Sequence, residues 1–219
     1  MVGAVIFDLD GVIVDTETPE YLAWKTLYAR HGWEFPLDLW LQNIGRVDSP
    51  FDALEPFRRP GSPLSPEEAL ALWREIRAAL EPGYLTPLPG VVRLVEALRA
   101  RGLPRAVASS SRTARVHGLL AALRLDDKFD AVACGDEVAH AKPWPDVYLL
   151  AAQRVGARPT ACVALEDSVN GLRAAKAAGM RCIAVPSALT RRLDFSPADL
   201  VVESLCEVTP DVIAAVASG

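Results

Sequence analysis

Short apolar segments recur along the chain, and most lack the alternation expected of a strand with one exposed face. The first begins at Val2 and runs into the acids Asp8 and Asp10. Continuous apolar runs of this length are typical of strands buried on both faces, as in a parallel sheet. Further candidate strands cover residues 104–109, 131–134, 160–165, 181–185 and 200–202.

Helical patterns separate these strands. They cover residues 91–101, 113–123, 145–155 and 169–178. Gly102 and Gly179 follow two of them, where a helix commonly ends on a left-handed glycine. Strands and helices that alternate in this way predict an α/β fold, a doubly wound parallel sheet with a Rossmann-like core.

One stretch interrupts the alternation. Between about Thr16 and Thr86 no segment has a convincing strand pattern, whereas residues 19–31, 37–44 and 66–80 have helical patterns. A Pro- and Gly-containing segment at residues 87–90 leads back into the α/β pattern. We therefore expect an all-helical cap of residues 16–87, inserted into a catalytic core of residues 1–15 and 88–219.

Composition limits the classes of partner. The chain has 219 residues and a net charge of -5, which supplies no basic surface for nucleic acid or an anionic membrane. No apolar run reaches membrane-spanning length, and the four cysteines form no CxxC pair. The N-terminal segment lacks the features of a leader peptide. We expect a cytoplasmic monomer with no nucleic-acid or membrane partner.

Polar residues follow four of the predicted strands at their carboxyl ends. They comprise two acids after the first strand, a serine cluster after the second, a lysine after the third and an acid pair after the fourth: Asp8, Asp10, Ser109, Ser110, Ser111, Lys142, Glu166 and Asp167. In an open parallel sheet, ligands bind at this edge, near the point where strand order reverses. The sequence therefore predicts one site that gathers acids, hydroxyls and a lysine.

This combination of side chains fits phosphoryl transfer. Asp8 can attack phosphorus, and Asp10, two residues further along the strand, can serve as general acid and base. The Ser109 hydroxyl, the backbone N–H of Ser110 and the Lys142 ammonium can hold phosphoryl oxygens. Crowded carboxylates repel one another and imply a bound cation, and an all-oxygen site for an anionic substrate favours Mg²⁺.

Each element has a simpler explanation when it is taken alone. A pair of acids at a strand end can cap a helix or bind a metal without catalysis, and Ser110 or Ser111 can be an N-cap. Glu166 and Asp167, followed by Ser168, can likewise cap the next helix. A lysine before proline is usually a solvated loop residue. The order and placement of all these residues together favour the catalytic interpretation.

The chain resembles a known family at four motifs. Phe7-Asp-Leu-Asp-Gly-Val12, Val107-Ala-Ser109, Lys142-Pro-x-Pro-Asp146 and Leu165-Glu-Asp-Ser168 are similar to the motifs of the haloacid dehalogenase superfamily. Within it, the chain resembles the β-phosphoglucomutase-like phosphatases with a helical cap. The presence of a second acid in the first motif argues against the true dehalogenases, which lack it.

The resemblance implies a role for each motif residue. Asp8 would be the nucleophile and a metal ligand, and Asp10 the acid and base that binds metal through its backbone carbonyl. Ser109 and Lys142 would hold phosphate. The acid pair Glu166 and Asp167 would complete the Mg²⁺ site.

The cap is where the chain departs from the mutases. β-Phosphoglucomutases typically carry a histidine soon after the first motif, whereas this chain has Glu20 in that region. Glu20 and Arg46, which follows Gly45 at a cap turn, are the candidate substrate contacts. Arg74 and Arg77 are interpreted as a solvated helix face. His31, His117 and His140 match no catalytic position.

The predicted function is Mg²⁺-dependent hydrolysis of a small phosphate monoester, such as a sugar phosphate, through an aspartyl-phosphate. A sugar phosphomutase is the alternative, because it uses the same intermediate with a sugar hydroxyl as acceptor. An acid such as Glu20 is poorly suited to an anionic sugar phosphate unless Arg46 pairs with it, which favours hydrolysis. A receiver-like signalling module is a remote alternative, since receivers lack both the DxD spacing and the cap.

Overall fold

The computed structural model describes residues 2–45 and 51–219. Its centre is a parallel sheet of six strands in the order β3-β2-β1-β4-β5-β6. The strands are β1 Ala4–Phe7, β2 Arg105–Ser109, β3 Ala131–Cys134, β4 Cys162–Glu166, β5 Arg181–Ala184 and β6 Leu200–Val201. The chain winds outward from β1 in both directions, so the predicted doubly wound sheet is confirmed, and β1 lies at the reversal of strand order.

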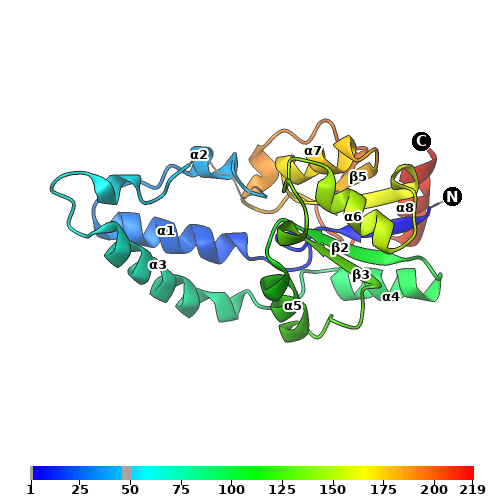
Figure 1. Ribbon diagram of the computed structural model, residues 1–219, viewed down its shortest axis with the longest axis horizontal. Helices are drawn as coiled ribbons and strands as arrows, with labels where there is room; N and C mark the ends of the chain where they lie inside the picture. The colour runs from blue at the N-terminus through cyan, green and yellow to red at the C-terminus, as the bar shows by residue number, and fades with distance from the viewer. Residues whose placement is uncertain (1, 46–50) are drawn as a thin grey trace.

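Helices cover both faces of the sheet (Figure 1). Alternate residues of β1 serve the two layers: Val5 and Phe7 belong to one buried cluster, Ala4 and Ile6 to the other. The first cluster contains residues of α4 Val91–Ala100, α5 Thr113–Ala122 and α8 Pro210–Ser218. The second contains residues of α6 Asp146–Arg154 and α7 Val169–Ala177.

The C-terminal helix α8 was not among the predicted elements. Its start carries clear signals, since Thr209 accepts a hydrogen bond from the Val212 N–H and Pro210 occupies the first turn. Both features are typical of helix N-termini. A short, mostly apolar helix has a sequence pattern much like that of a buried strand, so it is easily overlooked at the end of a chain of such strands.

The segment between the first strand and α4 is helical. It contains α1 Glu17–Arg30, α2 Leu37–Leu41 and α3 Pro66–Leu80, with 3-10 turns at Glu55–Arg58 and Glu81–Gly83. The described residues between 16 and 86 include no β-strand, as predicted. We call residues 16–45 and 51–87 the helical region; the domain boundaries at 15/16 and 87/88 remain a prediction.

The helical region has its own buried cluster. In Figure 1, α1 and α3 lie side by side at the end of the molecule opposite the two termini. The Trp24 and Trp73 rings stack with centroids 5.1 Å apart, and Tyr28 packs edge-on against Phe35 and Phe57. These contacts show that Trp24 and Trp73 pack within the cluster, although Trp24 and Trp40 also border the cavity described below.

Two chain connections join the helical region to the sheet, and they run beside each other. Val14 forms isolated β-bridges with Asp10 and Pro87, and the Leu88 N–H donates to the Ile13 carbonyl at 2.8 Å. These contacts place both connections next to the end of β1. Any movement of the helical region would therefore be transmitted to the loop that carries Asp10.

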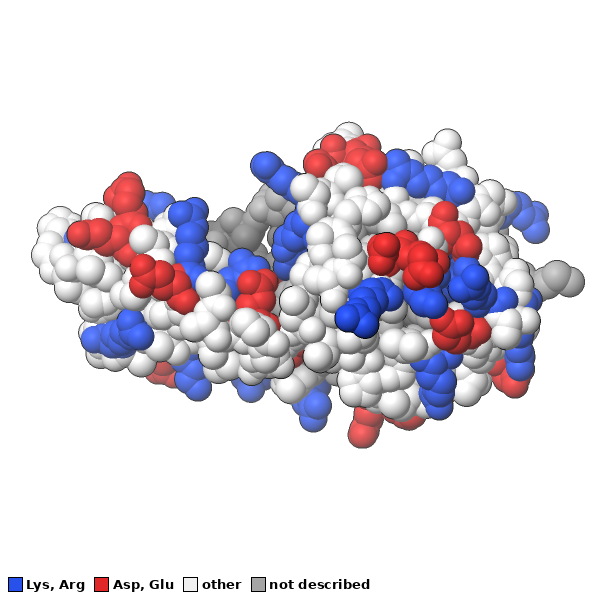
Figure 2. Space-filling view, turned by 90° about the horizontal axis from the view of Figure 1, so that it is seen from below, with Lys and Arg blue, Asp and Glu red and all other residues white. Residues whose placement is uncertain are grey.

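Charge is mixed on the surface. Figure 2 shows acidic and basic side chains interspersed over one face of the molecule, rather than a large area of one sign. Among the described residues, no helix has both the length and the apolar character needed to span a bilayer.

Candidate active site

The loop after β1 brings two acids to the carboxyl edge of the sheet. Asp8 directly follows the strand, and its N–H donates to the Leu165 carbonyl on β4 at 3.0 Å. Gly11 has φ +83°, and a Cβ there would lie 2.0 Å from Oδ2 of Asp167. Glycine at this position therefore lets the β1 loop pass directly over the acid that follows β4.

Lys142 connects the nucleophile candidate to the β4 acids. Its ammonium donates to Oδ1 of Asp8 and to Oε1 of Glu166, at 2.6 Å each, and its side chain is 1% exposed. Burial lowers the pKa of Lys142, but the carboxylates of Asp8 and Glu166 together outweigh this effect and raise the pKa to well above its usual range. The lysine is thus held as a buried cation.

Tyr148, on α6, is a supporting residue that the sequence analysis missed. Its hydroxyl donates to Oε1 of Glu166 at 2.5 Å, and the Lys142 ammonium lies 4.9 Å from the centre of its ring. Glu166 also accepts from the N–H and hydroxyl of Ser168. Because both of its oxygens already accept hydrogen bonds, Glu166 is fixed in place and can orient Lys142.

Three carboxylates form a cluster that could hold a metal ion. One oxygen each from Asp8, Glu166 and Asp167 lie within 4.8 Å of one another. Both oxygens of Asp167 are buried, and neither has a hydrogen-bond partner among the described residues. Unpaired buried carboxylates are unfavourable, so this set of oxygen ligands fits a hard cation such as Mg²⁺.

The electrostatics of Asp8 point the same way. Burial and the neighbouring carboxylate of Glu166 raise the pKa of Asp8 to about 8, against the opposing effect of Lys142. Burial, followed by the carboxylates of Asp8 and Glu166, also raises the pKa of Asp167. One lysine does not balance three buried acids, and a nucleophilic Asp8 must be ionised, so the site needs further positive charge.

The Asp10 carboxylate faces a separate set of donors. Oδ1 accepts from Thr16 Oγ1 at 2.5 Å and from Arg115 Nη1 at 2.9 Å. Oδ2 accepts from Ser109 Oγ at 3.4 Å and from Ser111 Oγ at 3.2 Å. The side chain of Asp10 is not part of the acidic cluster, and its predicted metal contact through the backbone carbonyl stays a prediction.

Thr16 and Arg115 were not predicted as site residues, and Ser111 was predicted only as one of the hydroxyls that follow β2, without a role of its own. The hint for Arg115 was its spacing, since it lies one helical turn after Ser111 and donates to that hydroxyl at 2.6 Å. The alternative that Ser110 or Ser111 caps α5 is wrong. Arg112 is the N-cap residue and its side chain makes no capping hydrogen bond, whereas the Thr113 N–H donates to Oδ1 of Asp136.

Ser109 and Ser110, two of the phosphate-binding candidates, lie at the carboxyl end of β2. Ser109, at the end of β2, is fully buried beside Asp10. The Ser110 hydroxyl donates to the Gly45 carbonyl at 3.0 Å. Asn170, a further residue missed from sequence, donates to the carbonyls of Gln42 and Ile44. Ser110 and Asn170 therefore join the helical region to the catalytic edge.

Ser168 has the capping role that the simpler explanation gave it. Its side chain accepts from the Gly171 N–H at the start of α7. A Cβ on Gly171 would lie 1.8 Å from Oε1 of Glu166, so the helix begins directly against that acid. Capping and site assembly are thus performed by the same short segment.

A cavity of about 550 Å³ lies between the catalytic edge and the helical region. Its catalytic side includes Asp8, Asp10, Ser110, Ser111, Arg112, Arg115, Lys142 and Asp167. Glu20 lines the opposite side, together with Glu17 and Arg77. Arg46, the other predicted substrate contact, lies outside the described residues.

The expectation for Arg77 was wrong. Its side chain is only 25% exposed, and its guanidinium lies 5.4 Å from the centre of the Trp73 ring. The helix α3 turns this residue toward α1, and hence into the cavity. Arg74, one turn earlier on α3, is exposed as predicted.

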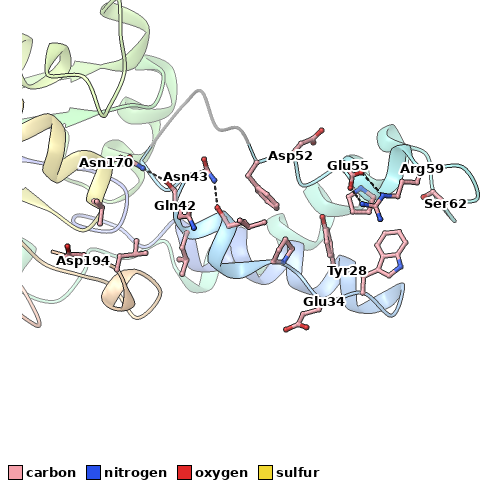
Figure 3. Close-up of a pocket in the computed structure, with 18 of the residues that line it drawn as sticks. Tyr28, Glu34, Gln42, Asn43, Asp52, Glu55, Arg59, Ser62, Asn170 and Asp194 are labelled. Atoms are coloured by element: carbon pink, nitrogen blue, oxygen red, sulfur yellow. Dashed lines mark hydrogen bonds and ion pairs between the residues drawn. The ribbon is translucent and has the colours of Figure 1, made fainter. Parts of the chain in front are cut away.

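A larger cavity of about 1250 Å³ lies along the helical region. Figure 3 shows it extending from Asn170 to the paired Glu55 and Arg59 at the far end. None of the described catalytic-edge residues Asp8, Asp10, Ser109 and Lys142 lines it. The larger cavity is therefore not the one at which the candidate catalytic residues converge.

Comparison with known proteins identifies the family. The sequence model of the haloacid dehalogenase-like hydrolases matches residues 2–179. The chain belongs to this family. The matched region spans every one of the four motifs and most of the sheet, so the predicted superfamily is confirmed.

Individual relatives are similar over almost the whole chain. YhcW of Bacillus subtilis (strain 168), a candidate phosphatase by name, is 41% identical over 95% of this chain and 94% of its own length. Hexitol phosphatase B of Escherichia coli (strain K12) is 37% identical over 94% of each chain. The solved β-phosphoglucomutase of Clostridium difficile has a TM-score of 0.75 and 27% identity, over 100% of this chain and 98% of its own.

These relatives bear out the predicted enzyme class. This family member is a phosphoric monoester hydrolase, in agreement with the phosphatases among its relatives. The buried acidic cluster is a candidate metal site, as the family's general use of a divalent metal leads one to expect. The roles of individual site residues remain predictions.

Proposed function

We propose that this enzyme is a Mg²⁺-dependent phosphatase that hydrolyses a small phosphate monoester through an aspartyl-phosphate on Asp8. One observation carries the proposal. Asp8 is buried in contact with Lys142, beside an acid, Asp167, whose oxygens have no partner among the described residues. This arrangement combines a carboxylate nucleophile with charges that can hold a phosphoryl group.

In the first step, an oxygen of Asp8 forms a bond to phosphorus, and the bond from phosphorus to the ester oxygen breaks. Asp10, in its protonated form, gives its proton to that leaving oxygen, and the alcohol departs. Lys142 and Ser109 bind the phosphoryl oxygens. Bound to Asp8 and Asp167, Mg²⁺ would supply the positive charge that offsets the anionic phosphoryl group.

In the second step, Asp10 accepts a proton from water, and the water oxygen bonds to phosphorus. The bond between phosphorus and Asp8 breaks, which releases inorganic phosphate and restores both acids. Donors on Thr16, Ser109, Ser111 and Arg115 hold Asp10 beside the β2 loop. These donors fix the position of the Asp10 carboxyl group before the substrate binds.

We also propose that residues 16–87 act as a cap that closes over the substrate, and that the enzyme is a cytoplasmic monomer. The contacts of Val14 with Asp10 and Pro87 support a pair of adjoining hinges. Closure would exclude bulk water from Asp8. Hydrogen exchange tests this: a phosphate analogue should protect both connections and the α2 end, and unchanged exchange there would exclude gating.

Phosphate release from a panel of monoesters tests the catalytic proposal. Activity should vanish with EDTA and return with Mg²⁺, whereas Ca²⁺ should substitute poorly because of its larger, looser coordination. The Asp8→Asn variant should be inactive, and the exposed Asp126→Asn variant is the control. Full activity after exhaustive EDTA treatment would contradict the metal requirement.

Phosphomutase activity is the competing function, and similarity to the β-phosphoglucomutase structure is the observation that favours it. Glu20 on the cavity surface supports hydrolysis, because it would repel the second phosphate of the sugar bisphosphate that a mutase must hold. The assay combines β-glucose 1-phosphate with a trace of glucose 1,6-bisphosphate. Free phosphate supports the phosphatase; stoichiometric glucose 6-phosphate with little free phosphate supports the mutase.

A further inference from the structure

The chain leaves α2 through a turn of residues 42–45, which we call the α2 turn. The last three carbonyls of the helix accept hydrogen bonds from within the helical region. Carbonyls of the α2 turn instead accept from the catalytic edge, through the side chains of Asn170 and Ser110. Because the final carbonyls of a helix have no partner within it, the catalytic edge completes the end of α2.

Asn170 makes two of these contacts. Its Nδ2 donates to the Gln42 carbonyl at 3.0 Å and to the Ile44 carbonyl at 2.8 Å, and the residue is only 4% exposed. Figure 3 shows Asn170 beside Gln42, where it borders the larger cavity. A primary amide has two N–H donors, and both are used here. One buried side chain therefore fixes two points of the α2 turn.

Ser110 makes the third contact, from the loop after β2. Its hydroxyl donates to the Gly45 carbonyl at 3.0 Å. Gly45 has φ +80°, and a Cβ there would lie 2.7 Å from Oγ of Ser168. The α2 turn therefore lies directly against the residue that caps α7, and glycine allows this close approach.

Both donors belong to segments that carry the candidate ligand-binding groups. Asn170 lies in the first turn of α7, three residues after Asp167, and Ser110 directly follows Ser109. Ser168 bonds both to the acid pair before it and to the first turn of α7. A shift of either segment on binding of Mg²⁺ or phosphate would therefore move the donors that hold the α2 turn.

Other described contacts of α2 with the catalytic part of the chain are less specific. Arg192 pairs with Asp38 at 3.4 Å, but both side chains are more than half exposed, and such pairs contribute little. Leu189 and Leu193 pack against the buried cluster of the helical region. Apolar packing is not directional, whereas hydrogen bonds are, so Asn170 and Ser110 set the position of the turn.

We propose that Asn170 and Ser110 are positioning residues that hold the α2 turn on the catalytic edge and couple docking of the helical region to the binding of phosphate and Mg²⁺ at Asp8. The inference rests on the function proposed above and adds the residues through which the two events influence each other. Coupling of this kind is reciprocal, so loss of either donor should weaken ligand binding as well as docking.

Hydrogen exchange tests the coupling, with inorganic phosphate and Mg²⁺ as the probes. In wild type, the two ligands together should slow exchange of the amides in residues 37–45 by about tenfold or more. Most of this protection should be lost in Asn170→Ala. Gln153→Ala, an exposed amide side chain on α6, is the matched control. Protection that survives in full in Asn170→Ala would overturn the proposal.

Asn170→Asp separates hydrogen bonding from packing. This substitution nearly keeps the size of the side chain, but an ionised carboxylate cannot donate and repels the two carbonyl oxygens. It should therefore lower the protection of residues 37–45 more than Asn170→Ala does. A side chain that only fills space would give the reverse order, which would contradict the positioning role.

The inhibition constant of inorganic phosphate against p-nitrophenyl phosphate gives a second readout. It should rise by about three- to tenfold in Asn170→Ala and in Ser110→Ala, which keeps the backbone N–H at position 110. The double variant should lose less than the two single effects multiplied, because both donors hold one turn.

Unchanged inhibition constants in these variants, with intact thermal unfolding, would overturn the coupling while leaving phosphatase activity in place. Absence of p-nitrophenyl phosphate hydrolysis by the wild type with Mg²⁺ would instead contradict the proposed function.

Discussion

The guanidinium of Arg115 donates to Oδ1 of Asp10 at 2.9 Å, across 105 residues of sequence. The same nitrogen donates to Ser111 Oγ at 2.6 Å. Burial lowers the pKa of Arg115, but the interaction with the Asp10 carboxylate opposes this effect, and the pKa is raised above its usual value. Arg115 therefore positions the proposed general acid and base from the neighbouring helix.

Arg115→Gln should impair acid catalysis more than phosphate binding. We expect kcat for an alkyl phosphate to fall by about tenfold, a part of the 10²–10⁴-fold typical of general acid catalysis. With p-nitrophenyl phosphate, whose leaving group needs little protonation, the loss should be smaller. Arg99→Gln, exposed on α4, is the control. Equal losses on both esters would assign Arg115 to phosphoryl binding instead.

Asp167→Asn should separate stability from metal binding. Removing a buried, unpaired charge should raise Tm in EDTA by about 2–4 °C, the shift expected for roughly 1 kcal/mol in a chain of this size. The stabilisation of wild type by Mg²⁺, about 2.7 kcal/mol at a hundredfold excess over Kd, should be lost. Differential scanning calorimetry measures both, and a variant that keeps the full Mg²⁺ response would exclude Asp167 as a ligand.

Tyr148→Phe tests the support of Glu166 and Lys142. Without the phenol, the buried Glu166 carboxylate loses one donor, and the free energy of unfolding should fall by about 1–3 kcal/mol. Affinity for Mg²⁺ should fall about 10–100-fold, as is usual when a group that orients a metal ligand is removed. Denaturant unfolding and Mg²⁺ titration of activity check this, with Tyr84→Phe as the control. Unaltered values would show that Tyr148 only fills space.

The strand pattern and the four motifs could be predicted from sequence because each is local. A buried parallel strand needs an apolar run, and its reactive residues come directly after it. Asp8, Ser109, Lys142 and Asp167 therefore converge once the sheet order is known. Gly11 belongs to the first motif, but its close approach to Asp167 appears only in three dimensions.

The rest depends on contacts between distant elements. Tyr148 reaches Glu166 from α6, and Arg115 reaches Asp10 from α5, so neither pairing has a sequence spacing that reveals it. Arg77 was misassigned because a charged residue on an amphipathic helix is usually solvated. Its place in the cavity follows from the packing of α3 against α1, which brings the residue toward Glu20.

Asp199 should make stability depend on pH. Burial raises the pKa of its carboxyl. Hydrogen bonds from Lys176, Arg181 and the Cys182 N–H outweigh this effect and lower the pKa to below its usual value. A carboxyl with a lowered folded-state pKa stabilises the protein above its unfolded pKa of about 3.9 and loses this contribution as pH falls through the folded value.

The Asp199→Asn variant measures that contribution. At pH 7 it should lower the free energy of unfolding by about 1–3 kcal/mol, as expected for hydrogen bonds between charged groups. The difference from wild type should shrink as pH falls below about 4. Thermal unfolding of both proteins between pH 7 and pH 3 checks this. A difference that stays constant over that range would contradict the assignment to the ionised carboxylate.

The central claim is that Asp8 carries the phosphoryl group during turnover. Enzyme quenched with acid during hydrolysis of a monoester, reduced with borohydride and analysed by peptide mass spectrometry should show homoserine at position 8, the product of a reduced aspartyl-phosphate. The Asp8→Asn variant should show no such product and no turnover. Turnover that persists in Asp8→Asn, or modification at a different residue, would contradict the account.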